Sequence, residues 1–396
     1  MNMNEQMKES EESILHTYNR FPVVFEKGHG CYLYDSEGKE YLDFAAGIAV
    51  NSLGYHYPGY DEALKDQIDK LMHISNLYYN EPIIEAGAKL VKASKMSKAF
   101  FTNSGTEAIE GALKAAKKYA YVRDGHADHE IIAMNHSFHG RSIGALSVTG
   151  TAHYREPFEP LMGGVKFADF NDLESVKAQI TDKTCAIITE VVQGEGGIYP
   201  AKKEFLEGLR QICDEKDIML IFDEIQCGMG RTGHYFAWQA YGVQPDIMTS
   251  AKALGCGVPV GAFVLNEKAA KASLEPGDHG TTYGGNPFVC AAVSKVFDIY
   301  ENDKIIEHVQ EMTPYLEQKL DEIVAKHECA ATRRGMGFMQ GIVIQGRPVG
   351  EVVKAALAKG LLVISAGSDV LRIVPPLVIT KEHIDKMAAI LDECME

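Results

Sequence analysis

Short apolar runs alternate with helical patterns between residues 98 and 265 of this chain. The runs are continuously hydrophobic rather than alternating, which is typical of strands that helices cover on both faces. They predict an α/β fold with a mostly parallel central sheet and helices on each side. The predicted strands lie at 99–102, 130–134, 185–189, 218–222, 246–249 and 260–265.

The two ends of the chain have a different pattern. Near the N-terminus a leading helix at 11–18 and a hairpin are predicted, and the hairpin strands lie at 31–34 and 39–44. Helical patterns follow at 59–71 and 82–93. After Asn286 the patterns predict helices to 326, at 351–359 and from 381, with strands at 341–344, 361–364 and 371–374. We therefore predict a large domain over 46–290 and a smaller α+β domain built from 1–45 and 291–396.

Composition and charge exclude several classes of protein. The net charge of -16 and the lack of a Lys/Arg-rich tract argue against a nucleic-acid partner. No apolar run resembles a signal peptide or approaches membrane-spanning length, so we expect a cytoplasmic location and no membrane partner. The eight cysteines are scattered without a C-x-x-C pair, which predicts reduced thiols and no metal site.

Lys252 ends one of these apolar runs and begins a glycine-rich turn. Its neighbours Ala251, Ala253 and Leu254 are apolar, so the amine is expected to be poorly solvated, which disfavours its charged form. An amine of this kind can form a Schiff base with an aldehyde. The alternative is a surface lysine, which is the commoner fate of a lone lysine.

Asp223 comes directly after the predicted strand 218–222. Its carboxylate therefore emerges at the carboxyl edge of the sheet, where ligands of open α/β folds collect. A carboxylate there can hold a heteroaromatic nitrogen protonated. Asp223 and Lys252 end successive strand patterns, so we expect both to face one site. A helix cap or a metal ligand is the alternative interpretation of Asp223.

Two turns that carry hydroxyl groups precede predicted helices. Ser104, Gly105 and Thr106 follow the strand at 99–102, and free N–H groups with the helix dipole favour a phosphate at such a helix start. Simple N-capping is the alternative. Thr281 and Thr282 lie in the second turn, at 280–287, which also suits an anion.

Four further side chains suit a planar ligand that carries a carboxylate. Phe138 can stack on a ring, and Arg141 can grip a carboxylate with both arms of its guanidinium. Arg372 lies inside an apolar strand pattern, where a charge is costly unless paired, and Glu195 is the candidate partner. Ordinary core packing of Phe138 and a structural ion pair of Arg372 are the alternatives.

Residues 228–233 match the G-x-G-x-x-G pattern of dinucleotide-binding proteins. That pattern requires a strand immediately before it and a helix that opens on it. Here 223–227 intervene, and 234–238 show no helical stripe. We interpret 228–233 as a flexible loop, which argues against a nicotinamide-dependent dehydrogenase.

A Schiff-base lysine, a carboxylate for a ring nitrogen, a phosphate-binding helix start and a stacking aromatic together describe a pyridoxal phosphate (PLP) site. With these residues the chain resembles the class III (ornithine-type) aminotransferases of fold type I over essentially its whole length. The resemblance rests on the runs 103–108, 137–141, 190–197, 222–226, 250–252 and 281–287. Within that class, the run 43–54 is similar to that of the acetylornithine aminotransferases, whereas 55–58, Ile225 and Cys227 depart slightly from the usual pattern.

The resemblance implies which residues would bind the cofactor. Lys252 would carry PLP as a Schiff base and shuttle a proton to and from the substrate carbon, and Asp223 would keep the pyridine nitrogen protonated. The other implied PLP contacts are Gln226 at the ring hydroxyl, Ile225 and Phe138 on the ring faces, Ser104, Gly105 and Thr106 at the phosphate, and Thr282 of the partner subunit in a homodimer.

The resemblance also implies the substrates. Arg141 would bind the α-carboxylate of N-acetylornithine, with Thr281 and Tyr18 nearby. Arg372 would bind glutamate or 2-oxoglutarate, and Glu195 would pair with Arg372 while the other substrate is bound. The implied reaction moves the δ-amino group of N2-acetyl-L-ornithine to 2-oxoglutarate in arginine biosynthesis. Succinylornithine, ornithine and 4-aminobutyrate remain alternative donors, and a PLP-binding regulator without turnover is an alternative of another class.

Overall fold

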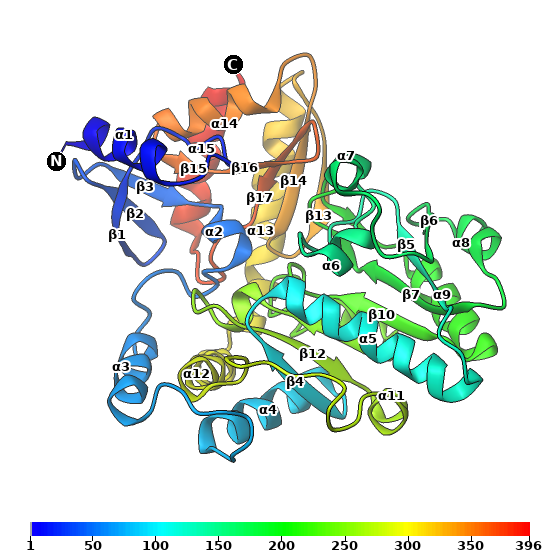
Figure 1. Ribbon diagram of the computed structural model, residues 1–396. Coiled ribbons are helices and arrows are strands. Elements are labelled where there is room, and N and C mark those ends of the chain that lie inside the picture. The colour runs from blue at the N-terminus through cyan, green and yellow to red at the C-terminus, as the bar shows by residue number, and fades with distance from the viewer. Residues whose placement is uncertain (1) are drawn as a thin grey trace.

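The computed structural model describes residues 2–396 and is built around a seven-stranded sheet (Figure 1). The strands follow the order β4-β12-β11-β10-β7-β5-β6. Only β12 runs antiparallel to its neighbours, so the predicted mostly parallel sheet is confirmed. The strands are β4 (Lys98–Thr102), β5 (Glu130–Met134), β6 (Val165–Ala168), β7 (Thr184–Glu190), β10 (Met219–Asp223), β11 (Ile247–Ser250) and β12 (Gly261–Leu265).

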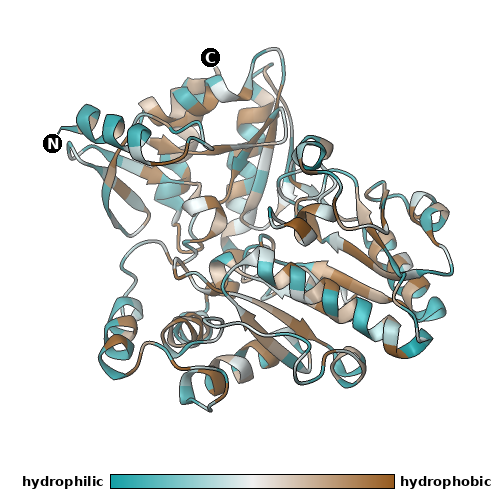
Figure 2. Ribbon diagram, viewed as in Figure 1, coloured by the Kyte–Doolittle hydropathy of each residue, from teal (hydrophilic) through white to brown (hydrophobic). Residues whose placement is uncertain are grey.

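Helices cover both faces of this sheet, as the continuous apolar runs predicted. Ile131 and Ile221 pack in one hydrophobic cluster with residues of α5 (Gly105–Asp124). Ile132 and Phe222 pack in the other cluster with residues of α9 (Lys203–Lys216). Successive residues of a strand point to opposite faces, so each strand must be apolar at every position. Figure 2 shows these strands as mainly hydrophobic, whereas α5 carries polar and apolar bands.

Further elements precede, connect or follow the strands of the central sheet. They are α2 (Ala46–Ala49), α3 (Tyr60–Lys70), α4 (Glu81–Ser94), α6 (Ile143–Ser147), α7 (Ala152–Arg155), η1 (Glu156–Phe158), α8 (Leu173–Gln179), β8 (Val192–Gln193), β9 (Tyr199–Pro200), α10 (Trp238–Tyr241), η2 (Lys252–Leu254), α11 (Glu267–Ala272) and α12 (Pro287–Asn302). The hydrophobic pattern missed β6, because this edge strand is only half-buried and contains Lys166.

The two ends of the chain form two four-stranded sheets, with orders β1-β2-β3-β15 and β13-β14-β17-β16, and they meet in the first of these. β15 runs parallel to β3, so the C-terminal part of the chain extends the N-terminal hairpin. The strands are β1 (Phe25–His29), β2 (Tyr32–Asp35), β3 (Glu40–Asp43), β13 (Ala330–Met336), β14 (Met339–Ile344), β15 (Leu361–Leu362), β16 (Ile364–Ala366) and β17 (Val370–Ile373). The single strand predicted at 361–364 is in fact divided between the two sheets. The domain boundaries proposed above stay a prediction.

Helices α13 (Ile305–Lys326), α14 (Val349–Ala358) and α15 (Lys381–Met395) lie beside these two sheets (Figure 1). The predicted leading helix at 11–18 is wrong in position, because α1 spans Met3–Ser13. Asn2 and Glu5 form a capping box that begins the helix there. Among residues 2–396, no helix combines the length and the apolar character needed to cross a bilayer.

Residues 228–233 form buried turns, so their interpretation as a flexible loop is wrong. Arg231 is fully buried in this segment and donates hydrogen bonds to the carbonyl oxygens of Phe338 and Pro375. These bonds hold the segment against the C-terminal part of the chain. No helix opens on the glycines, which agrees with the argument against a dinucleotide site.

Candidate active site

A cavity of about 450 Å³ lies beside the carboxyl ends of β10 and β11. Asp223 and Thr249 are in register on these two adjacent parallel strands, and Lys252 lies three residues beyond Thr249. The cavity therefore collects side chains from segments far apart in the sequence. Its walls include Ser104, Gly105, Thr106, Phe138, Arg141, Asp223, Ile225, Gln226 and Lys252.

Lys252 is half-buried at the start of η2, directly beyond β11. Its backbone has φ +48, in the left-handed region that a side chain other than glycine rarely adopts. Strain of this kind is found where surrounding structure holds a residue for a function. Burial lowers the pKa of Lys252, although Glu195 opposes the shift. The neutral, nucleophilic amine is thus more accessible than in an exposed lysine.

Asp223 ends β10 and is 4% exposed. Its Oδ1 accepts a hydrogen bond from the backbone N–H of Ile225 at 3.0 Å and one from the Thr249 hydroxyl at 3.3 Å. The alternative function as a helix cap belongs to its neighbour Glu224, whose oxygens accept the first N–H groups near α10 at 2.8 Å. Asp223 is therefore held in a fixed orientation on the wall of the cavity.

His139 is a residue of this site that the sequence reasoning did not single out. It is fully buried, and its Nδ1 lies 2.7 Å from Oδ2 of Asp223. The bond holds the second oxygen of the carboxylate, because Oδ1 is already engaged. A signal was present in the sequence, since His139 stands between the two predicted residues Phe138 and Arg141.

Glu190 was also missed, although it begins one of the runs that carry the family resemblance. It ends β7 in register with Asp223 and lines the cavity. From residues 2–396 its carboxyl group receives two long hydrogen bonds, from the N–H of Phe138 at 3.3 Å and from that of Gly194 at 3.4 Å. Burial, and then the Asp223 carboxylate, raise the pKa of Glu190 well above its ordinary value. Its protonated form is thereby favoured.

The start of α5 forms another wall of the cavity. Ser104 is the N-cap, and its side chain accepts a hydrogen bond from the N–H of Glu107 at 3.3 Å, so it does serve the helix. The Thr106 hydroxyl lies 2.7 Å from that of Ser142. A Cβ on Gly105 would lie only 2.9 Å from the Ile225 side chain. Glycine at this position therefore lets the Ile225 side chain pack directly against the start of α5.

Two arginines of the site differ in whether a carboxylate already pairs with them. The Arg141 guanidinium lies over the Tyr154 ring at 4.0 Å and near the Phe138 ring at 5.4 Å, and it forms no ion pair with a carboxylate among residues 2–396. Arg372 is buried and paired with Glu195, with Nη1 to Oε1 at 2.5 Å and Nη2 to Oε2 at 3.3 Å. Arg141 is thus ready to bind an anion, whereas Arg372 is already occupied.

The Arg372–Glu195 pair joins the cavity through Gln226, whose Oε1 accepts a hydrogen bond from Nη1 of Arg372 at 3.2 Å. Burial alone would raise the pKa of Glu195, but the Arg372 guanidinium outweighs it and lowers that pKa. Glu195 is therefore ionised in the pair. A competing carboxylate can take its place on Arg372 if the Glu195 side chain moves away.

Five predicted residues lie outside the cavity walls, namely Glu195 and Arg372, which adjoin it through Gln226, and Tyr18, Thr281 and Thr282. Tyr18 is 72% exposed, and Thr282 is exposed. The Thr281 hydroxyl accepts a hydrogen bond from the side chain of Asn103 at 3.3 Å, and Asn103 does line the cavity. The structure thus brings Thr281 near the site but leaves Tyr18 and Thr282 in solvent.

Comparison with known proteins identifies the family. The model of the family described as aminotransferase class-III matches residues 14–395. The chain belongs to the class-III aminotransferases. This aminotransferase is 47% identical over 388 residues to the acetylornithine aminotransferase of Clostridium acetobutylicum, a match that covers 98% of this chain and 100% of that protein. It is 44% identical over 385 residues to the succinylornithine transaminase of Yersinia pseudotuberculosis, with 94% of this chain and 92% of that protein covered.

Solved structures confirm the fold of this class-III aminotransferase. An ornithine aminotransferase from Toxoplasma gondii superposes with a TM-score of 0.95 at 28% identity, covering 100% of this chain and 94% of that chain. That structure is described as showing partial occupancy of PLP at its active site. The predicted fold type I, with a large parallel-rich sheet, is therefore confirmed.

Proposed function

We propose that this aminotransferase moves the δ-amino group of N2-acetyl-L-ornithine to 2-oxoglutarate, giving N-acetylglutamate 5-semialdehyde and glutamate. The observation that carries the proposal is that the site has two arginines in different states. Arg141 has no carboxylate partner among residues 2–396, whereas Arg372 is paired with Glu195. Two substrates that each bear a carboxylate can then use one cavity in turn. The high identity to the Clostridium acetobutylicum protein supports acetylornithine as the donor.

The residues of the cavity fit PLP as the cofactor. Lys252 offers an amine whose pKa is lowered by burial, and the start of α5, with Gly105 and Thr106, lines the cavity where its N–H groups can bind a phosphate. Asp223 presents a fixed carboxylate at the sheet edge. When bound, PLP supplies an aldehyde for this amine and a ring that accepts electrons from the substrate carbon.

Each residue then has one task in the reaction. Lys252 would accept a proton from the substrate carbon and return it, as general base and acid. Asp223, oriented by His139, would keep a proton on the ring nitrogen of the cofactor. Phe138 and Ile225 would contact the ring. The remaining proposed contacts are Gln226 at the ring hydroxyl and Ser104, Gly105 and Thr106 at the phosphate.

Each of the two arginines binds the carboxylate of a different substrate. Arg141 binds the α-carboxylate of N-acetylornithine, with Thr281 and Tyr18 completing that side of the site. Arg372 stays paired with Glu195 during this half-reaction. In the other half-reaction Glu195 moves away, and Arg372 binds the α-carboxylate of glutamate or 2-oxoglutarate with the same bidentate geometry.

The proposal includes a homodimer in the cytoplasm. Large apolar side chains are exposed around 68–84 and at Tyr283, including Leu77 at 86% and Tyr79 at 96%. A concentration of this kind marks an interaction surface rather than ordinary solvent-facing structure. Thr282 adjoins Tyr283, so a second copy seated here would bring the partner's Thr282 toward the phosphate site of this chain.

Borohydride trapping followed by peptide mass analysis tests the cofactor assignment. The pyridoxyl adduct is expected on Lys252, and an adduct on any other lysine would refute it. The donor is tested by comparing kcat/KM for N-acetylornithine, succinylornithine, ornithine and 4-aminobutyrate with 2-oxoglutarate as acceptor. Turnover of free ornithine equal to or better than that of acetylornithine contradicts the proposal. Succinylornithine is the second candidate, because a transaminase of that name is 44% identical to this chain.

A further inference from the structure

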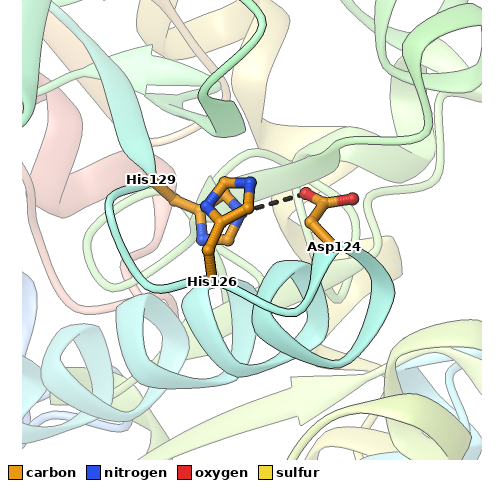
Figure 3. A group of neighbouring side chains, drawn as sticks. All are labelled: Asp124, His126 and His129. Carbon is orange, nitrogen blue, oxygen red and sulfur yellow. Dashed lines mark hydrogen bonds and ion pairs between the residues drawn. The ribbon is translucent and has the colours of Figure 1, made fainter.

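Three side chains of metal-binding type gather where α5 ends and the chain turns toward β5 (Figure 3). They are Asp124, His126 and His129, and one ligand atom of each lies within 4.8 Å of the others. α5 has 20 residues and is about 30 Å long, and its other end forms the wall of the active-site cavity. The cluster is therefore remote from the proposed reaction and has no part in it.

The two histidines are arranged one over the other. The His129 side chain is only 1% exposed, and its Nε2 lies 2.9 Å from Oδ2 of Asp124. The His126 ring stacks on it with centroids 4.5 Å apart and 19° between the planes, and the His126 side chain is 49% exposed. One nitrogen of each imidazole and one oxygen of the carboxylate thus lie within 4.8 Å of one another, and solvent reaches them from the His126 side.

A second observation distinguishes this cluster from a chance grouping of surface residues. Nδ1 of His126 lies 2.6 Å from Asp128, and Lys183 holds the other oxygen of Asp128 at 2.5 Å. Histidines that bind metals usually donate their second ring N–H to a carboxylate, which fixes the tautomer. With the proton of His126 on Nδ1, its Nε2 carries the lone pair that a metal ion needs.

The charges around the cluster set the strength of binding. Arg123 donates hydrogen bonds from Nε and Nη2 to the two oxygens of Asp124, both at 2.6 Å. The two carboxylate oxygens have about four lone-pair sites, so lone pairs remain for a cation. The C-terminus of α5 also favours positive charge. The charge of Arg123 opposes a divalent ion, so binding is weaker than in a closed site with four protein ligands.

We propose that Asp124, His126 and His129 bind one Zn²⁺ ion, with water completing a tetrahedral shell. Neutral imidazole nitrogens and a carboxylate oxygen are regular zinc ligands. In the bound form His129 ligates through Nε2 and carries its proton on Nδ1. The ion would join the last turn of α5 to the residue that precedes β5, so it is a structural site that stabilises this corner of the fold.

Calorimetric titration of the holoenzyme with a zinc salt, without substrate, tests the proposal. The native protein is expected to bind one Zn²⁺ per chain and to show a higher Tm with zinc than with a chelator. His126→Ala is expected to lose both effects, and Asp128→Asn to weaken binding about tenfold. His327→Ala is the matched control, because His327 also pairs with a carboxylate, Asp392, at 2.7 Å but lies outside the cluster.

Each outcome of the titration either supports or contradicts the zinc site. Binding that the control retains and His126→Ala loses supports the site. No saturable binding at one ion per chain, or equal affinity in the native protein and His126→Ala, overturns it. Aminotransferase activity is expected to be unchanged in His126→Ala, which verifies that the variant is folded and shows that the result does not depend on the proposed reaction.

Discussion

Replacing Arg372 with alanine is expected to separate the two half-reactions of this aminotransferase. Arg372 now gives two hydrogen bonds to the carboxylate of Glu195. If glutamate takes the place of Glu195, the variant loses two hydrogen bonds between charged groups, each contributing at least about 1.5 kcal/mol. A total of about 3 kcal/mol corresponds to a fall of about 150-fold in kcat/KM for glutamate. For acetylornithine no substrate contact is lost, and we expect a change of less than about tenfold.

Single-turnover kinetics of the holoenzyme with glutamate alone or acetylornithine alone measures the rate of each half-reaction separately, through the change in cofactor absorbance. Arg141→Ala is the matched control and is expected to show the reverse preference. Arg372→Lys keeps the charge but loses the planar fork, so it is expected to recover only part of the loss. Equal losses with both donors in Arg372→Ala, at an unchanged Tm, would refute the idea that Glu195 and the substrate exchange on Arg372.

Three further predictions concern the cofactor site and the core. Asp223→Asn is expected to lower kcat about 10- to 100-fold, because one hydrogen bond between charged groups is lost, and steady-state assays that show full activity would contradict the proposed role. Because burial lowers the pKa of Lys252, the rate at which PLP loads onto cofactor-free protein should rise with pH and level off below the range of an ordinary lysine, about pH 10.4. A loading rate that still rises at about pH 10.4 would contradict a lowered pKa of Lys252. Gly111→Ala is expected to destabilise the fold by about 1–3 kcal/mol, since its Cβ would lie 2.2 Å from the Phe263 ring, and an unchanged urea midpoint would show that the core adapts.

The patterns that predicted the fold correctly were those decided by local sequence. Strands buried on both faces are apolar at every position, so β5, β7 and β10 were found within one or two residues of their observed ends. β6 and β13 were missed, because an edge strand and a strand that carries Arg333 and Arg334 are half in solvent and show no continuous apolar run. Periodicity reports burial, and these two strands are only partly buried.

The residues of the site also divide into those that local sequence predicted and those that it did not. Residues at strand ends and helix starts, such as Asp223, Lys252 and Gly105, were predicted because their positions in the sequence show where the sheet edge must be. His139 and Glu190 were not, because their importance lies in contacts with Asp223 across 84 residues of sequence in one case and across adjacent strands in the other. Tyr18 and Thr282, which lie in solvent in a single chain, keep the roles assigned to them only as predictions.

The sequence by itself determined the class of fold, the family and the types of chemical group at the site, because these follow from short-range pattern and residue identity. Only the tertiary structure decided that Arg372 is closed on Glu195 while Arg141 is free, that His139 holds Asp223, and that a His–His–Asp cluster forms at the far end of α5. Each of these depends on side chains meeting at hydrogen-bond distance, and that is settled by how strands and helices pack rather than by any one segment.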